Sequence, residues 1–118
     1  MYQRINFQCK VINVATIEYN KIVRDKIPER IRRSGKCAVC DVLSSEEALP
    51  YLEKKLFEEA NEYIQSKDLE ELADLLEVIQ GVLYHRGISW ETLETLRQKK
   101  YDERGGFEKG IRLNKVVE

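Results

Sequence analysis

The amino-acid sequence predicts a mostly α-helical domain, a small helical bundle with short β-strands at its flanks. Apolar residues recur at helical spacing through most of residues 27–103, and short breaks with glycine, serine or lysine separate the helical segments. Strand-like patterns are confined to three short segments. The chain has 118 residues, 42% of them hydrophobic, which is the usual size of one domain and enough for one core.

The charge balance argues against several classes of partner. Lysine and arginine number 20 against 21 acidic residues, so the net charge is −1 and no basic excess indicates a nucleic acid. No apolar run approaches the roughly 18 residues that would predict a membrane span. The opening MYQRINFQCKV lacks the apolar core of a signal peptide, so we expect a cytoplasmic protein.

Three short segments predict β-strands. Residues 4–11 alternate strictly between apolar and polar side chains, and residues 37–43 and 111–116 are further candidates. Because a single strand is not stable alone, we expect these strands to pair with one another or with another subunit.

The three cysteines do not form a disulfide framework. Cys37 and Cys40 form a C-x-x-C, and Cys9 and the single histidine, His85, would complete four zinc ligands. A second ligand pair at fixed spacing is missing, and no βαβ pattern surrounds the C-x-x-C as in a redox dithiol. We therefore expect the cysteines to be small, buried, apolar side chains on a strand.

The first two helices have clear start and stop signals. The first spans about residues 27–34, with Gly35 beyond its end and Asp25 as its capping residue rather than a metal ligand. The second starts after Ser44, where Glu47 completes a capping box. Its apolar residues recur at helical spacing: Leu49, Leu52, Leu56, Ala60 and Tyr63.

Two further helices follow. Asp68 is expected to cap the third, at about residues 69–86, which is apolar around much of its circumference. Such a helix is buried on more than one side, in a bundle or an oligomer interface. Ser89 caps a fourth helix that ends near Glu103, before two glycines.

Carboxylates occur three residues apart on both the second and the third helix. Glu59 and Glu62 lie beside the apolar stripe of the second helix, while Glu71 and Asp74 lie within or at the margin of an apolar arc of the third. An ionised carboxylate near apolar surface is costly unless a cation compensates it. A short turn would bring the two pairs face to face, with no matching lysine, as oxygen ligands for Mg²⁺ or Mn²⁺. From helix geometry alone, a solvated charged edge remains an equal alternative.

Three motifs in order resemble a known superfamily. E-E-x-x-E at residues 58–62, followed by E-x-x-D at 71–74, resembles the all-α nucleoside triphosphate pyrophosphohydrolases, which include MazG-like and phosphoribosyl-ATP pyrophosphohydrolases. Y-N-K-I-V-R-D-K-I-P at 19–28 and R-G-G-F-E-K-G-I at 104–111 look like the opening and closing signatures of the phosphoribosyl-ATP pyrophosphohydrolase-like branch. The resemblance predicts one such domain at residues 19–118, preceded by an extension at 1–18 about which it implies nothing.

The resemblance implies a role for each motif. The four carboxylates would hold Mg²⁺ or Mn²⁺, and water would cleave the α–β bridge of a nucleoside triphosphate into a monophosphate and pyrophosphate. Basic side chains would clamp the phosphates, and two glycines would let the backbone approach the ligand. The carboxylates are Glu59, Glu62, Glu71 and Asp74; the phosphate-binding residues are Lys21, Arg24, Lys26, Lys100, Arg104, Gly105 and Gly106.

Alternatives remain at this stage. The enzyme would be a house-cleaning hydrolase of nucleoside triphosphates, or a phosphoribosyl-ATP pyrophosphohydrolase of histidine biosynthesis. A non-catalytic helical module that binds nucleotide or dimerises is a third hypothesis. Only eight residues separate Glu62 from Glu71, so the turn must be tight and the preferred base is not indicated. The resemblance and the apolar third helix both predict a homodimer or homotetramer built on the second and third helices.

Overall fold

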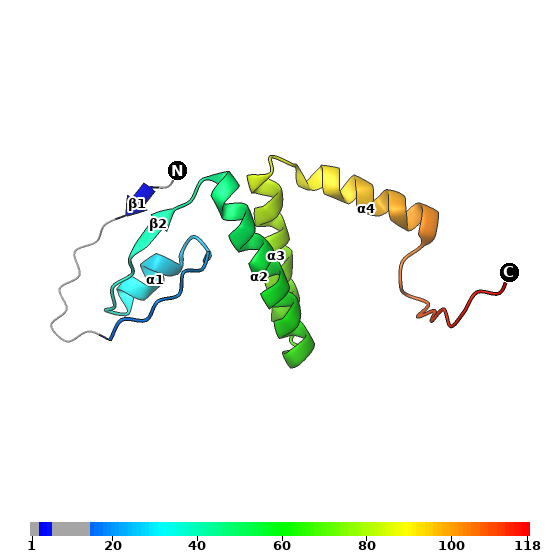
Figure 1. Ribbon diagram of the computed structural model, residues 1–118, viewed down its shortest axis with the longest axis horizontal. Coiled ribbons are helices and arrows are strands. Elements are labelled where there is room, and N and C mark those ends of the chain that lie inside the picture. The colour runs from blue at the N-terminus through cyan, green and yellow to red at the C-terminus, as the bar shows by residue number, and fades with distance from the viewer. Residues whose placement is uncertain (1–2, 6–14) are drawn as a thin grey trace. The chain divides into compact units, whose positions relative to one another are not determined.

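The computed structural model describes residues 3–5 and 15–118 and is mostly helical, as predicted. It contains four helices and two short strands in this part of the chain (Figure 1). In chain order they are β1 (Gln3–Ile5), α1 (Ile27–Arg33), β2 (Cys40–Val42), α2 (Ser45–Ser66), α3 (Leu69–His85) and α4 (Trp90–Arg104). The chain divides into two compact units, Met1–Gly87 and Ile88–Glu118. Among the described residues, no helix combines the length and the apolar character needed to cross a membrane.

Helices α2 and α3 form an antiparallel hairpin and lie side by side (Figure 1). The predicted capping box starts α2: Ser44 Oγ accepts a hydrogen bond from the Glu47 amide, and Glu47 Oε1 accepts one from the Ser44 amide. Lys67 then adopts a left-handed conformation with φ of 64° and donates its amide hydrogen to the Tyr63 carbonyl. The predicted tight turn is confirmed. Asp68 occupies the N-cap position of α3, although its side chain makes no capping hydrogen bond.

The core lies between the two helices of this hairpin. Val78 of α3 packs with Ala48 and Leu52 of α2, and a Cβ at Gly81 would meet the Leu52 side chain at 3.3 Å. A glycine there therefore lets the helices approach closely. Partly buried apolar side chains complete the cluster, namely Ile22, Leu43, Leu56 and Val82.

The rest of the apolar surface of the hairpin stays uncovered within one chain. On α3, Leu69, Leu72 and Leu76 are 79%, 40% and 48% exposed, and on α2 Phe57 is 77% exposed. The sequence predicts that α3 is buried on more than one side. Within the described residues of a single chain, this burial is not found.

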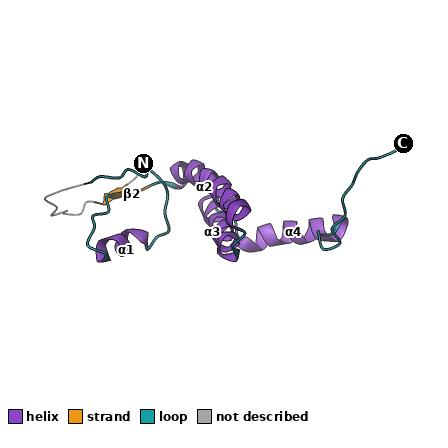
Figure 2. Ribbon diagram, turned by 90° about the horizontal axis from the view of Figure 1, so that it is seen from below, coloured by secondary structure: helices purple, strands orange, loops and turns teal. Residues whose placement is uncertain are grey.

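The strands form one short antiparallel pair, in which Gln3 faces Val42 and Ile5 faces Cys40. This pair confirms part of the predicted strands at 4–11 and 37–43; residues 6–14 lie outside the described part. The predicted strand at 111–116 is wrong, because that segment has no regular structure (Figure 2). A strand needs a hydrogen-bonded neighbour, and the alternation of side chains alone does not supply one.

Helix α1 ends as predicted, with Gly35 in the left-handed region at φ of 87°. The predicted Asp25 cap is wrong. Lys26 holds the N-cap position without a side-chain cap, and the Ile27 amide bonds to the Arg24 carbonyl. Pro28 in the first turn has no amide hydrogen, so fewer donors there need a cap.

The cysteines differ from the expectation. Cys37 is exposed and disulfide-bonded, whereas Cys40 is half-buried with a free thiol. A disulfide sulfur is not a zinc-binding thiolate, so this C-x-x-C does not act as a zinc ligand pair. Cys9 lies outside the described residues.

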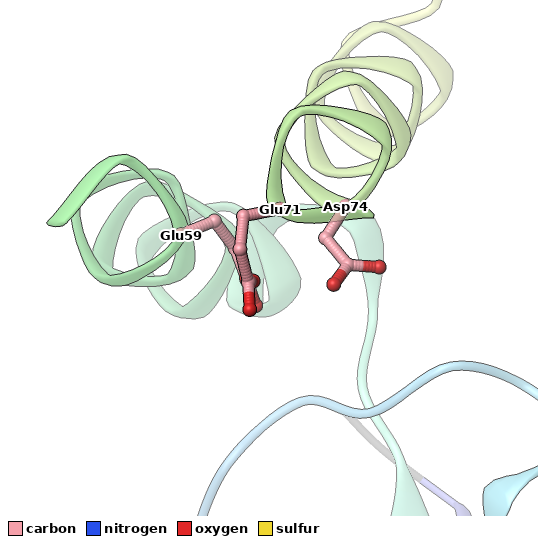
Figure 3. Close-up of side chains that lie close together, drawn as sticks. All are labelled: Glu59, Glu71 and Asp74. Atoms are coloured by element: carbon pink, nitrogen blue, oxygen red, sulfur yellow. The ribbon is translucent and has the colours of Figure 1, made fainter. Parts of the chain in front are cut away.

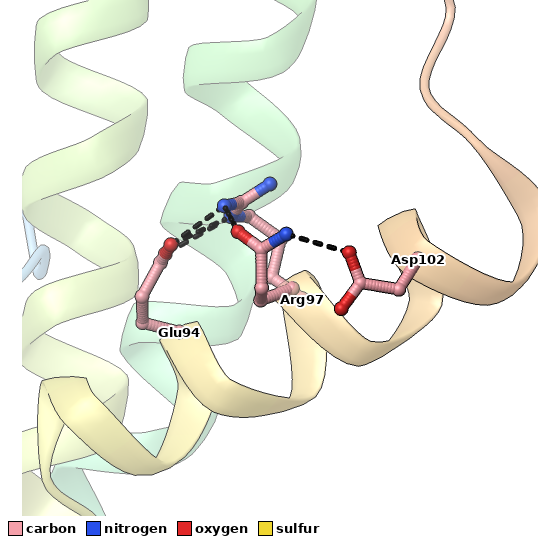
Figure 4. Close-up of polar contacts among 4 residues, drawn as sticks. Glu94, Arg97 and Asp102 are labelled. Carbon is pink, nitrogen blue, oxygen red and sulfur yellow. Dashed lines mark hydrogen bonds and ion pairs between the residues drawn. The ribbon is translucent and has the colours of Figure 1, made fainter.

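The second unit contains α4, which begins and ends close to the predicted residues. Ser89 Oγ accepts a hydrogen bond from the Thr92 amide, and Gly105 with φ of 79° ends the helix. No residue of α4 is buried. Polar pairs lie on its surface. Arg97 donates hydrogen bonds of 2.6 to 3.1 Å to the Glu94 carboxylate and so lowers the pKa of that carboxyl (Figure 4).

Candidate metal centre

Three of the four predicted carboxylates meet on one side of the α2–α3 hairpin. Glu59 of α2 and Glu71 and Asp74 of α3 each offer an oxygen, and these oxygens lie within 4.8 Å of one another (Figure 3). The spacing of three residues places Glu71 and Asp74 on the same face of α3. The tight turn then brings that face against Glu59. We call these three residues the acidic cluster.

The acidic cluster contains buried oxygens that lack hydrogen-bond partners. Glu59 is 7% exposed and is the one buried charged residue in the described part of the chain. Glu59 Oε2 and Glu71 Oε2 are both buried without a hydrogen bond. Buried polar atoms are nearly always satisfied, and an uncompensated buried carboxylate destabilises a fold. The cluster therefore fits a bound cation, and carboxylate oxygens are the ligands of hard divalent ions.

The electrostatics of the cluster favour the same conclusion. Burial raises the pKa of the Glu59 carboxyl, and the nearby Glu62 carboxylate raises it further. Burial and Glu62 also raise the pKa of Glu71, with smaller contributions from Asp74 and Glu59. Like charges held together in a partly desolvated place resist ionisation, and a divalent cation reverses this effect.

Glu62, the fourth predicted ligand, is exposed and borders the cluster. It is not one of the three residues whose oxygens converge, but its charge acts on both Glu59 and Glu71. Glu58 instead forms an ion pair with Lys21, at 3.3 Å between Nζ and Oε2. The expectation that no lysine shares these helix faces is wrong, because Lys55 Nζ lies 3.6 Å from Glu59 Oε1, one helical turn away.

Two of the predicted phosphate-binding cations reach the hairpin from residues 15–26, which we call the strap. Arg24 Nη2 lies 2.6 Å from Asp74 Oδ1, and Lys21 binds Glu58. Ile22 between them packs against the hairpin core and so holds the strap in place. Lys26 is exposed at the start of α1.

The remaining predicted residues belong to the second unit, and their convergence on the cluster stays a prediction. Gly105 caps α4, and a Cβ at Gly106 would lie 2.9 Å from the Tyr101 ring. Both glycines thus have a local structural role. Lys100 and Arg104 are exposed residues of α4.

Sequence reasoning missed three residues of α2 that lie near the strap. Tyr51, Lys54 and Lys55 of α2 line a small crevice against the strap. The available signal was the K-K pair one helical turn before Glu58 and Glu59, because residues four apart are neighbours on a helix.

The fold and the site define a helical hairpin with a partly buried acidic cluster that could hold a metal ion. Comparisons of the chain with models of protein families, with curated proteins and with solved structures found no match.

Proposed function

We propose that the protein is a metal-dependent nucleoside triphosphate pyrophosphohydrolase, which cleaves the α–β bridge to give a monophosphate and pyrophosphate. The observation that carries the proposal is the pair of buried, unsatisfied oxygens of Glu59 and Glu71 beside Asp74. A purely structural role does not explain buried carboxylate oxygens that lack hydrogen-bond partners, because buried polar atoms are nearly always satisfied. The order of motifs in the sequence supports this chemistry over other uses of a metal.

In this proposal Glu59, Glu71 and Asp74 hold Mg²⁺ or Mn²⁺, and Glu62, whose charge already acts on Glu59 and Glu71, would complete the ligand set. The bound cation would make water more acidic and neutralise charge on the departing pyrophosphate. The oxygen of water forms a bond to a phosphorus at the α–β bridge, and the bond from that phosphorus to the bridging oxygen breaks.

The basic residues bind and orient the phosphates. Arg24 is the best placed, since it already contacts a cluster carboxylate and its planar fork matches two phosphate oxygens. Lys21 and Lys26 occupy the same strap, and Lys100 and Arg104 would add to the clamp from the second unit.

A substrate panel tests the proposal. The protein is incubated with Mg²⁺ and standard, deoxy and non-standard nucleoside triphosphates as well as phosphoribosyl-ATP, and pyrophosphate is measured. Hydrolysis of the nucleoside triphosphates with Mg²⁺ supports a house-cleaning hydrolase. A clear preference for phosphoribosyl-ATP supports the alternative of an enzyme of histidine biosynthesis. Nucleotide binding without turnover of any substrate would overturn the proposal and favour a non-catalytic module.

A further inference from the structure

A crevice between the strap and α2 opens beside the acidic cluster. Its volume is about 40 Å³, far below the roughly 300 Å³ or more of a pocket that encloses a whole small-molecule ligand, so its enclosed part admits a small group and not a nucleobase. Residues of the strap form one wall and residues of α2 form the other. The lining residues are Asn20, Lys21, Ile22, Tyr51, Lys54, Lys55 and Glu58.

Cations are concentrated at this crevice. Helix α2 contains six glutamates and two lysines, and both lysines, Lys54 and Lys55, line the crevice. The strap supplies a third ammonium group from Lys21. An acidic helix thus places its own positive charge at one location, one helical turn before Glu58 and Glu59.

The ion pairs leave one of these cations uncompensated. Lys21 is paired with Glu58, and Lys55 with Glu59 of the acidic cluster. Lys54 has no ion pair among the described residues. Lys54 is exposed, and an ammonium group at a crevice with no carboxylate paired to it can bind an anion; the pair between Lys55 and Glu59 connects this crevice to the proposed cation site.

The wall formed by the strap is fixed in two ways. Ile22 packs into the hairpin core, and Asn20 adopts a left-handed conformation with φ of 48°, which asparagine tolerates better than most residues. The position of Lys21 in the crevice is thereby set by its neighbours on both sides.

We propose that this crevice binds the phosphate groups of the substrate that leave as pyrophosphate, with Lys54, Lys21 and Lys55 as the anion ligands. This inference rests on the proposed function, since the ligand spans the crevice and the adjacent cation. Lysine ammonium groups suit the task because they act as mobile point charges that can follow phosphates of changing geometry. The ligand class is a diphosphate or longer phosphate chain.

The test uses Lys54→Gln, because no hydrogen bond or ion pair joins Lys54 to the acidic cluster in the described part of the chain. Binding of inorganic pyrophosphate is measured by calorimetry at saturating Mg²⁺ for the wild type, for this variant and for Lys99→Gln, which removes an exposed lysine of the second unit. We expect the Kd for pyrophosphate to rise at least five-fold in Lys54→Gln and to stay within two-fold in Lys99→Gln. The Kd for Mn²⁺ alone should stay within two-fold in both variants.

Two further measurements separate this inference from the proposed function. The affinity for a nucleoside monophosphate should be the same in Lys54→Gln as in the wild type. If the variant loses as much affinity for the monophosphate as for pyrophosphate, the crevice does not bind the phosphates that leave as pyrophosphate. Wild-type pyrophosphate affinity in Lys54→Gln, or no pyrophosphate binding by the wild type, would also overturn it. If Lys54→Gln weakens pyrophosphate binding but no triphosphate is hydrolysed, the crevice stands as a phosphate site and only the proposed function fails.

Discussion

Arg24 and Asp74 stand fifty positions apart in the chain and form an ion pair with 2.6 Å between Nη2 and Oδ1. The pair joins the strap to the acidic cluster, so one predicted phosphate-binding residue contacts one predicted metal ligand. Both side chains are partly exposed, and an exposed ion pair stabilises a fold by only about 0–1 kcal/mol. The pair therefore matters because it places Arg24 next to the acidic cluster.

Replacing Arg24 should impair the interaction with substrate. Arg24→Ala is expected to lower kcat/KM by an amount equivalent to about 2–4 kcal/mol, because the guanidinium group that would bind the departing pyrophosphate is lost. Arg24→Lys should lose less, since the charge remains. Steady-state kinetics at saturating Mg²⁺ provide the measurement, and Arg33→Ala, which breaks a pair with Glu29 on α1, is the control. Near-normal kcat/KM in Arg24→Ala would make this residue an ordinary surface charge.

Arg104 tests whether the second unit takes part in the site. If it grips the same phosphates, Arg104→Ala should lower kcat/KM by about the same 2–4 kcal/mol, with metal binding preserved. Arg112→Ala, which removes a charge beyond the closing signature, is the matched control in the same kinetic assay. Equal activity of the two variants would contradict a role for Arg104.

Metal binding should stabilise the folded protein. Mg²⁺ or Mn²⁺ binds the native cluster and not the unfolded chain, so either ion should raise the Tm in a concentration-dependent way. Glu71→Gln and Asp74→Asn should abolish this rise and leave the metal-free Tm equal or higher, because a repelling charge is removed. Differential scanning calorimetry is suitable, with the exposed Glu77→Gln on α3 as control. A full Mg²⁺ effect in either cluster variant would disprove the ligand assignment.

The stability of the metal-free protein should depend on pH through Glu59. Burial and the nearby Glu62 carboxylate raise the pKa of Glu59 in the folded protein above its ordinary value, so the native state holds this proton more tightly than the unfolded state does. The free energy of unfolding should therefore fall as the pH rises from about 4.5 through the raised pKa. Urea denaturation in the presence of a chelator should show this fall in the wild type and a smaller one in Glu59→Gln. Identical pH profiles for the two proteins would contradict the expectation.

The uncovered apolar face of α3 leads to a prediction about assembly. Leu69, Leu72 and Leu76 recur at helical spacing and remain exposed, and a second copy of the chain would cover them. We expect at least a dimer by light scattering at micromolar concentration. The double variant Leu72→Glu/Leu76→Glu should dissociate it, whereas Leu96→Glu on α4 should not. A monomeric wild type would refute this prediction.

The features that the sequence predicted well are those that depend on local chemistry. Ser44, Ser89 and Gly105 fix helix ends through hydrogen bonds or conformations within a few residues, and the structure confirms all three. The meeting of Glu59 with the carboxylates of α3 was also predictable, because helical spacing and a short turn determine which faces meet.

The features that the sequence missed depend on distant parts of the chain. Ile22 lines the crevice and packs against the hairpin core, and no local pattern predicts that contact. The strand at 111–116 failed because a strand requires a neighbour. The cap by Asp25 failed because Pro28 had already removed one of the donors that a cap would satisfy.

The products formed from a triphosphate with Mg²⁺ distinguish cleavage at the α–β bridge from cleavage elsewhere and from no cleavage. The wild type should release pyrophosphate and nucleoside monophosphate in equal amounts, Glu77→Gln should do the same, and Glu71→Gln should release neither. Release of orthophosphate with a nucleoside diphosphate would contradict cleavage at the α–β bridge, and undiminished pyrophosphate release by Glu71→Gln would contradict the role of the acidic cluster.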